Sequence, residues 1–172
     1  MVWTRTKLMI WDYLLEPLKV IQFDYAGKAP EKLYKKINEL IRIVFDVPDA
    51  YVQEKDYNWE KEGNTEKFAV GWEVHKVLDL YSYLEYEIVL KGFTTDGAGR
   101  ARIRLRARLI TEYPQDTLLQ NNIIYEMLRR MWHRIFYHNR RMEFLRIGKE
   151  LTINFENKLK QYLEYLREGK AE

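Results

Sequence analysis

The sequence has no cysteine and only one serine among its 172 residues. The missing thiol excludes a disulfide framework, a cysteine nucleophile and any Cys-ligated zinc or iron–sulfur site. Ser82 lies between two tyrosines, without the Gly-x-Ser-x-Gly elbow of serine hydrolases. The longest run without a charged residue, nine residues from 117 to 125, is far shorter than a membrane span of roughly 20 apolar residues. We therefore expect a cytoplasmic protein, with a Lys- and Glu-rich composition typical of thermophiles.

The net charge of +3 conceals a separation of charge along the chain. Ten of the fourteen arginines fall between positions 100 and 141. The stretch 97–142 contains three acids and no lysine, so it carries +7 and the remaining residues carry −4. The basic part is expected to face either the acidic part of the chain or an anionic partner.

Hydrophobic periodicity divides the chain into helices and strands. No repeat or linker interrupts it, so we expect one domain over residues 1–172 with its core in residues 19–140. Lys19–Tyr25 predicts a strand, and Pro30 opens a helix with apolar residues at helical spacing up to Val44. Beyond Pro48 the period changes to two, which predicts four strands over 50–60, 68–77, 83–93 and 100–111. Their short polar or glycine-bearing links are typical of an antiparallel meander.

The alternation also predicts how the strands pair. A hairpin centred near position 80 places Glu73 opposite Glu87 and His75 opposite Glu85, and it makes the other face apolar. An odd-sum register across the next glycine-rich turn brings Glu85 and Glu87 beside arginines of the last strand. These arginines would offset the repulsion between Glu73 and Glu87.

From Pro114 onward the hydrophobic period is helical again. One apolar stripe runs from Ile124 to Met142, and a second predicts an additional C-terminal amphipathic helix over 149–168, with Gly148 as the break. The expected fold class is α+β, an antiparallel β-meander of five to seven strands packed on helices, with a long C-terminal helical region. A sixth or seventh strand would come from residues 2–9 or from a split of a long strand.

Two arginine patterns suggest surfaces for anions. Arginines at every second position from 100 to 108 either present guanidinium forks to an anion or pair with glutamates on the same face. The helix over 129–141 has five arginines, two histidines and no acid, which is typical of surfaces for nucleic acid or anionic lipid. A solvated face or an acidic partner within the chain is the alternative for this helix. Its arginines are Arg129, Arg130, Arg134, Arg140 and Arg141.

The titratable residues form no catalytic or metal motif. His133 and His138 lie five apart, about 140° around a helix, and cannot bind one metal from one face. Flanking arginines would keep Glu73, Glu85 and Glu87 ionised and weakly basic, the wrong direction for a general base. We expect no catalytic residue, no metal site and no cofactor.

Aromatic residues make up 15% of the chain. Tyr51, Tyr57 and Trp59 share a strand parity. Residues expected to face inward are Trp72, Tyr86, Phe93, Trp132 and Phe136. Core packing explains such residues, and a partly open apolar cavity is the alternative. The residues expected to line a cavity are Trp72, Tyr86, Trp132 and Phe136.

The segment Phe23-Asp24-Tyr25-Ala26-Gly27-Lys28-Ala29-Pro30-Glu31-Lys32-Leu33-Tyr34 resembles the first strand and first helix of the START/SRPBCC helix-grip superfamily. The stretch from Tyr83 to Tyr113 is similar too, with two long strands, a glycine turn and then a proline before the last helix. The resemblance spans residues 19–140. It implies a curved sheet gripping a long helix over a cavity for hydrophobic or amphipathic small molecules. Many members bind or transport lipids, and some are cyclases or hydrolases, so hydrolysis or cyclisation is a third hypothesis. A second helical segment after the meander departs from the family and would fill or cover that cavity.

The resemblance and the aromatic content together favour a non-catalytic binding protein for a hydrophobic or amphipathic small molecule. The alternative is an interaction module that docks an acidic protein, nucleic acid or an anionic membrane surface through the Arg-rich helix 129–141. Binding of a neutral ligand in a cavity should be nearly independent of salt, whereas docking on exposed arginines should weaken with salt.

Overall fold

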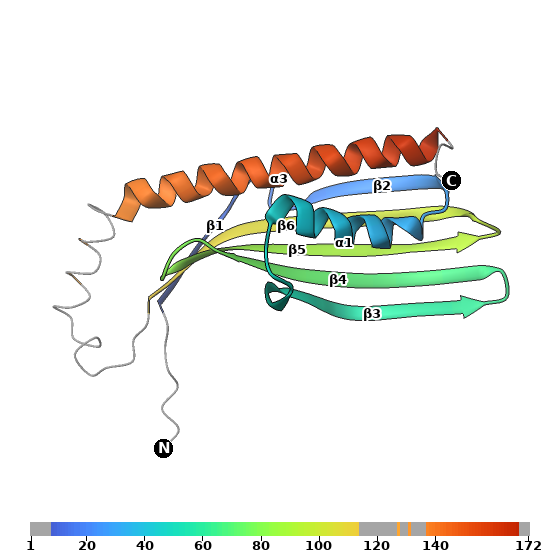
Figure 1. The fold of residues 1–172 in the computed structure, drawn as a ribbon, viewed down its shortest axis with the longest axis horizontal. Helices are drawn as coiled ribbons and strands as arrows, with labels where there is room; N and C mark the ends of the chain where they lie inside the picture. The colour runs from blue at the N-terminus through green and yellow to red at the C-terminus, as the bar shows by residue number, and fades with distance from the viewer. Residues whose placement is uncertain (1–7, 114–126, 128–130, 132–136, 169–172) are drawn as a thin grey trace, which may run out of the picture.

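The computed structural model describes residues 8–113, 127, 131 and 137–168 (Figure 1). The elements of this part are β1 Leu8–Tyr13, β2 Ile21–Lys28, α1 Lys32–Phe45, the 3-10 turn η1 Asp49–Tyr51, β3 Val52–Glu62, β4 Thr65–Val77, β5 Ser82–Thr95, β6 Ala98–Tyr113 and α3 His138–Arg167. The predicted α+β class with an antiparallel sheet is confirmed.

The strands form one antiparallel sheet in the order β1-β6-β5-β4-β3, and β2 also pairs with β6. β1 pairs with residues 108–113 of β6, and β2 pairs with residues 98–105. The two short strands therefore occupy successive parts of one edge of β6. β1 is the sixth strand, and it overlaps the segment predicted for an extra strand, 2–9, only at positions 8 and 9, since residues 2–7 lie outside the described residues.

The strands β4, β5 and β6 pair in the register that the alternation predicts. Glu73 lies opposite Glu87, and His75 lies opposite Glu85. Across the next pairing, Glu87 faces Arg106 and Glu85 faces Arg108. Successive residues of a strand point to opposite faces, so the alternating apolar residues all reach one face, which we call the inner face. Its buried members include Val70, Val74, Leu84, Ile88, Leu90, Ile103 and Leu105.

The helices α1 and α3 both pack on the inner face (Figure 1). Phe45, at the end of α1, stacks on Tyr86 of β5 with ring centroids 4.0 Å apart and on Phe155 of α3 at 5.3 Å. All three rings are buried and fill the space between the sheet and the helices. Within the described residues, neither helix is long and apolar enough to cross a bilayer.

The helix α3 runs without interruption for 30 residues, so the predicted break at Gly148 is wrong. A Cβ at this position would lie 2.7 Å from a methyl group of Leu14 and 2.9 Å from one of Leu84. Glycine therefore allows close contact between the helix and the sheet rather than a turn. The residues expected to form a separate helix over 149–168 continue α3, and Leu159 and Leu166 belong to the same core as the sheet.

A polar cluster joins the first turn of α3 to the end of the sheet. The Arg141 Nε and Nη2 atoms donate to Asp12 Oδ2 at 3.1 and 2.6 Å, and Nη1 donates to Thr111 Oγ1. The Tyr137 hydroxyl donates to the Asp79 carboxylate at 2.9 Å. Arg141 is 5% exposed, so its charge is stabilised inside the protein by these partners.

We expect Gly148→Val to lower the free energy of unfolding by about 1–3 kcal/mol, because the added methyl groups must displace Leu14 and Leu84 in a filled core. Lys149→Val is the matched control on the exposed side of the helix, with an expected loss of about 0.5 kcal/mol from helix propensity. Urea unfolding followed by circular dichroism measures both variants. Equal urea midpoints for Gly148→Val and Lys149→Val would contradict the packing role of Gly148.

We expect Asp12→Ala to destabilise the protein by about 1–3 kcal/mol, because the buried Arg141 guanidinium loses its carboxylate partner. Adding Arg141→Met should recover part of this loss, since no buried charge then lacks a partner. A double-mutant cycle by chemical denaturation measures the coupling. Strict additivity of the two substitutions would show that the pair is not coupled.

Candidate anion-binding site

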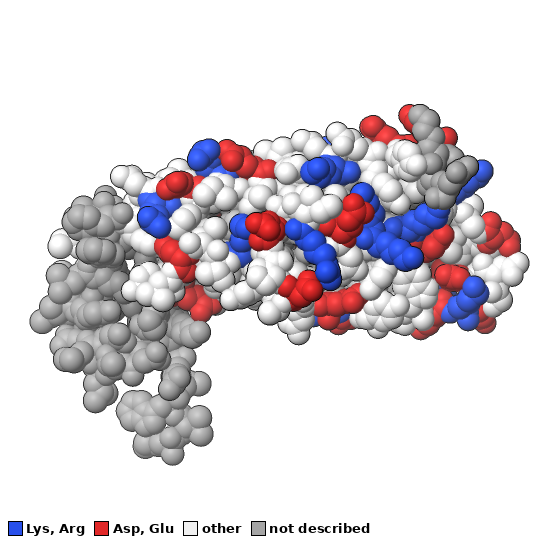
Figure 2. All heavy atoms as spheres, in the orientation of Figure 1, with Lys and Arg blue, Asp and Glu red and all other residues white. Residues whose placement is uncertain are grey.

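The outer face of the sheet, opposite α1 and α3, bears the charged residues of the strands. On β6 the odd-numbered residues from 101 to 109 are buried on the inner face, so the even-numbered arginines from 100 to 108 lie on the outer face. Figure 2 shows the helix-bearing side, where acidic and basic side chains are intermingled. The outer face instead divides into two halves that differ in charge balance.

In the half next to β1, basic and acidic side chains form pairs across the strands. The pairs are Arg106–Glu87, Arg108–Glu85 and Lys55–Glu73. The hydrogen bond from Lys55 lowers the pKa of the Glu73 carboxyl group. The hydrogen bond to Glu87 raises the pKa of Arg106. As predicted for Glu73, such a carboxylate stays ionised and is a weak general base near neutral pH.

Three residues of this half lie close enough to share a metal ion. One ligand atom each of Glu73, His75 and Glu85 lies within 4.8 Å of the others. His75 Nε2 is 3.1 Å from Glu73 Oε1 and 3.8 Å from Glu85 Oε1. Lys55 and Arg108 already pair with the Oε2 atoms of the two carboxylates, and their positive charges disfavour a divalent cation beside them. An ion-pair network that links the strands explains this cluster.

In the other half, toward the turns that join β3 to β4 and β5 to β6, cations outnumber acids. We call it the cationic half. Its basic residues are Lys67, Lys91, Arg100, Arg102 and Arg104, and the acids near them are Asp24, Asp56, Glu60 and Glu62. Like charges directly opposite each other destabilise a sheet, and Lys91 lies directly opposite Arg102.

Most cations of this half have no carboxylate partner. Arg102 Nε donates to Asp24 Oδ1 at 2.6 Å, and this hydrogen bond lowers the pKa of Asp24. Asp24 and Arg102 are both more than half exposed, so the pair contributes little to stability. Lys91, Arg100 and Arg104 form no ion pair within the part of the chain that the structure describes.

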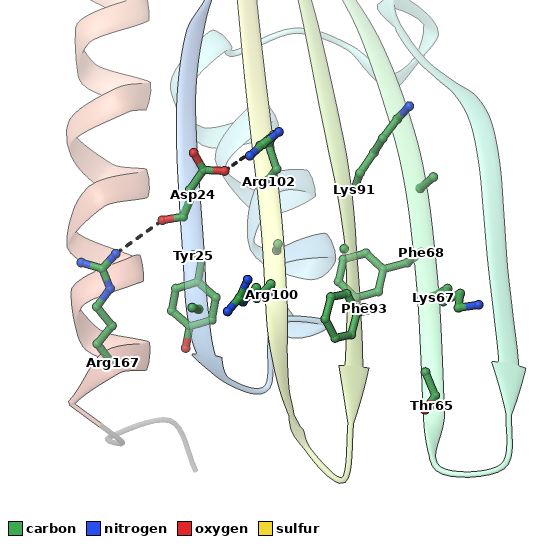
Figure 3. A pocket seen from close by; sticks show the side chains of 14 residues that line it. Asp24, Tyr25, Thr65, Lys67, Phe68, Lys91, Phe93, Arg100, Arg102 and Arg167 are labelled. Carbon is green, nitrogen blue, oxygen red and sulfur yellow. Dashed lines mark hydrogen bonds and ion pairs between the residues drawn. The ribbon is translucent and has the colours of Figure 1, made fainter.

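An open pocket of about 880 Å³ lies in the cationic half (Figure 3). Phe93, which is 44% exposed, and the small residues Ala26 and Ala69 supply apolar surface. The basic residues that line it are Lys67, Lys91, Arg100, Arg102 and Arg167. A neighbouring trough of about 570 Å³ shares two of these cations and extends to Arg104.

The pocket is assembled from strands that are far apart in the sequence. Asp24 lies on β2, Phe93 on β5 and Arg100 on β6, and the last turn of α3 contributes Arg167. Arg167 donates to the backbone oxygen of Asp24 at 3.4 Å, so the end of α3 is tied to β2 (Figure 3). The pocket therefore depends on the docking of α3 as well as on the sheet.

The aromatic residues predicted to line a cavity are described in part. Trp72 is 1% exposed and lies beside Tyr34 with ring centroids 5.7 Å apart, and Tyr86 is fully buried against Phe45. Both belong to the packed core, and neither lines the pocket or the trough described above. Trp132 and Phe136 lie outside the described residues.

The arginines predicted to meet a partner are also described in part. Arg129, Arg130 and Arg134 lie outside the described residues. Arg140 is exposed, with its guanidinium 5.6 Å from the ring centroid of Phe144 and 3.9 Å from the Asp79 carboxylate. Arg141 is buried against Asp12, which corrects the expectation of an exposed side chain, because a partner could reach it only by breaking that pair.

The expectation that Phe93 faces inward is wrong. Phe93 shares the parity of Glu87 and Lys91, which lie on the outer face, so the same alternation that predicted the pairing also placed this ring outside. Lys67 and Lys91 are further pocket residues that the arginine pattern alone did not indicate. The signal for Lys91 was its position opposite Arg102, whereas Lys67 stands opposite Glu60 and Phe93 and could be placed only by its strand parity.

No family model matches the chain, and no curated protein matches it. Among solved structures it is similar to Ara h 8.0201, a helix-grip protein, at 10% identity over 84% of this chain and 96% of that chain, with a TM-score of 0.24. It is also similar to a protein of unknown function from Staphylococcus aureus, at 15% identity over 92% of this chain and 95% of that chain, with a TM-score of 0.27. At these identities and TM-scores the likenesses assign neither a family nor a function to this chain.

Proposed function

We propose that this protein binds, without catalysis, a small amphipathic molecule with an anionic group in the pocket of the cationic half. The observation that carries the proposal is a set of cations, Lys91, Arg100 and Arg104, that have no carboxylate partner among the described residues and lie beside an exposed apolar ring, Phe93. A ligand carboxylate, sulfate or phosphate would offset the repulsion between Lys91 and Arg102.

The apolar part of the ligand would lie on Phe93 and the small residues beside it. The pocket volume of about 880 Å³ falls within the range of roughly 300–1,000 Å³ of small-molecule sites. Because the pocket is open, the ligand keeps one side in solvent, and we expect modest affinity. An amphipathic anion would contact both the cations and the apolar surface of the pocket, whereas a neutral lipid would contact only the apolar surface.

This proposal moves the ligand from the interior to the outer face of the sheet. A ligand between the sheet and α3 would have to displace the stacked rings of Phe45, Tyr86 and Phe155. Docking of an acidic protein, nucleic acid or anionic membrane through helix 129–141 remains the alternative. Its support is the arginine content of that helix.

Isothermal titration with octanoate, 1-octanol and acetate tests the proposal. We expect octanoate to bind most tightly, because it alone combines the charge with the apolar chain. The double variant Arg100→Glu/Arg104→Glu should weaken octanoate binding by about tenfold or more, with little change in stability because neither arginine is paired. Raising the salt concentration should weaken octanoate binding to the wild type.

The double variant Lys35→Glu/Lys149→Glu is the matched control, since it makes the same change in net charge on exposed helix positions. We expect it to bind octanoate as the wild type does. Equal affinity for octanoate and 1-octanol, independent of salt, would place the ligand in an apolar interior instead. Equal losses in the two double variants would show that only net charge matters and would reject the pocket.

A further inference from the structure

A second group of partly exposed aromatic rings lies on the inner side of the sheet, at the edge strand β3. Tyr34 of α1 meets Tyr57 and Trp59 of β3 with ring centroids 6.1 and 5.8 Å apart. Tyr57 and Trp59 are nearly parallel, at 21°, with centroids 6.3 Å apart, and both stand steeply to Tyr34, at 73° and 80°. Tyr57 and Trp59 are thus stacked, with Tyr34 at a steep angle to both, and we call this cluster of three rings the aromatic box.

A β-bulge builds the aromatic box. The pairing of β3 with β4 shifts between Lys55 and Asn58, and Asp56 adopts a left-handed conformation with φ of 53°. The shift places Glu54 and Tyr57, three residues apart, on the same face as Trp59. Without the bulge, strand alternation would send Glu54 and Tyr57 to opposite faces.

The carboxylate of Glu54 gives the aromatic box a negative charge. It accepts a long hydrogen bond of 3.5 Å from the Tyr34 hydroxyl and forms no ion pair within the described residues. Burial, and then Glu54, raise the pKa of Tyr34, so its hydroxyl stays a neutral donor. The cation–π contacts found in the described part lie elsewhere, at the rings of Tyr13, Tyr162 and Phe144.

We propose that the aromatic box binds a methylated ammonium cation. A cation about 4 Å outside the triangle of ring centroids would lie about 5 Å from each, within the roughly 6 Å of a cation–π contact. Methyl groups on the nitrogen remove its hydrogen-bond donors and favour aromatic faces over water, and Glu54 supplies the opposite charge. Tyr57 is 58% exposed, so solvent reaches the rings.

The site is independent of the proposed anion pocket, because Lys67, Lys91 and Arg100 lie on the opposite face of the sheet. Glu54 disfavours a phosphate next to the ammonium group. We therefore expect choline and Nε-trimethyl-lysine to bind more tightly than phosphocholine. If choline binds more tightly than Nε-trimethyl-lysine, the ligand is a free small cation. If Nε-trimethyl-lysine binds more tightly, the ligand is a methylated lysine side chain.

Nuclear magnetic resonance titration of the tryptophan indole N–H signals tests the proposal, with the Trp59 signal assigned by its loss in Trp59→Phe. Choline should shift this signal with a millimolar dissociation constant, and 3,3-dimethyl-1-butanol, its uncharged carbon analogue, should bind about tenfold more weakly or not at all. Tyr57→Ala should weaken choline binding by about tenfold, whereas Tyr57→Phe should retain it because the ring face is kept. Glu54→Gln should weaken choline binding by about threefold or more.

Tyr165→Ala, which removes an exposed tyrosine of α3, is the control and should leave choline binding unchanged. Three outcomes would each overturn the proposal: no choline-dependent shift at Trp59, equal affinity for the uncharged analogue, or unchanged binding by Tyr57→Ala. Tighter binding of phosphocholine than of choline would contradict the role given to Glu54. The aromatic-box variants should still bind octanoate, because the anion pocket lies on the other face of the sheet. The proposal for the aromatic box can therefore fail while the proposal for the anion pocket holds, and the reverse.

Discussion

Tyr86, Phe45 and Phe155 stack as three buried rings that join the sheet to α1 and to α3. Neither helix can leave the inner face without exposing an aromatic ring, which makes this stack the contact on which the two-layer arrangement depends. Burial also raises the pKa of Tyr86, so its phenol stays neutral within the stack. These rings occupy the space between the sheet and the two helices, and the pocket and the trough described above lie on the outer face.

The two-residue period of the strands governs both faces at once. The same alternation that buries Ile103 and Leu105 sends five arginines of β6 to the outer face. Register then divides these arginines, because Glu85 and Glu87 stand opposite Arg108 and Arg106, whereas Val89 and Lys91 stand opposite Arg104 and Arg102. One strand thus carries a charge-balanced half and a half with excess positive charge.

Local departures from regular structure could not be anticipated from periodicity. Gly148 looked like a helix break because glycine often ends helices, yet it allows contact between α3 and Leu14. The bulge at Asp56 has no residue pattern that distinguishes it from a regular strand, and it places Lys55 and Trp59, which share a parity in the sequence, on opposite faces. Phe93 was a different case, because the predicted register already placed it on the outer face.

The amino-acid sequence was sufficient to predict β2 to β6, the pairing of β4, β5 and β6, and the opposition of Glu85 and Glu87 to arginines. These follow from the alternation of apolar and charged residues, which is local information and is enforced by burial of one face. The folded arrangement was needed to show that Arg141 is buried against Asp12, that Phe45 stacks between Tyr86 and Phe155, and that Tyr34 reaches Tyr57 and Trp59. Each of these depends on contacts between segments far apart in the chain, where helix docking and a single-residue bulge set which side chains meet.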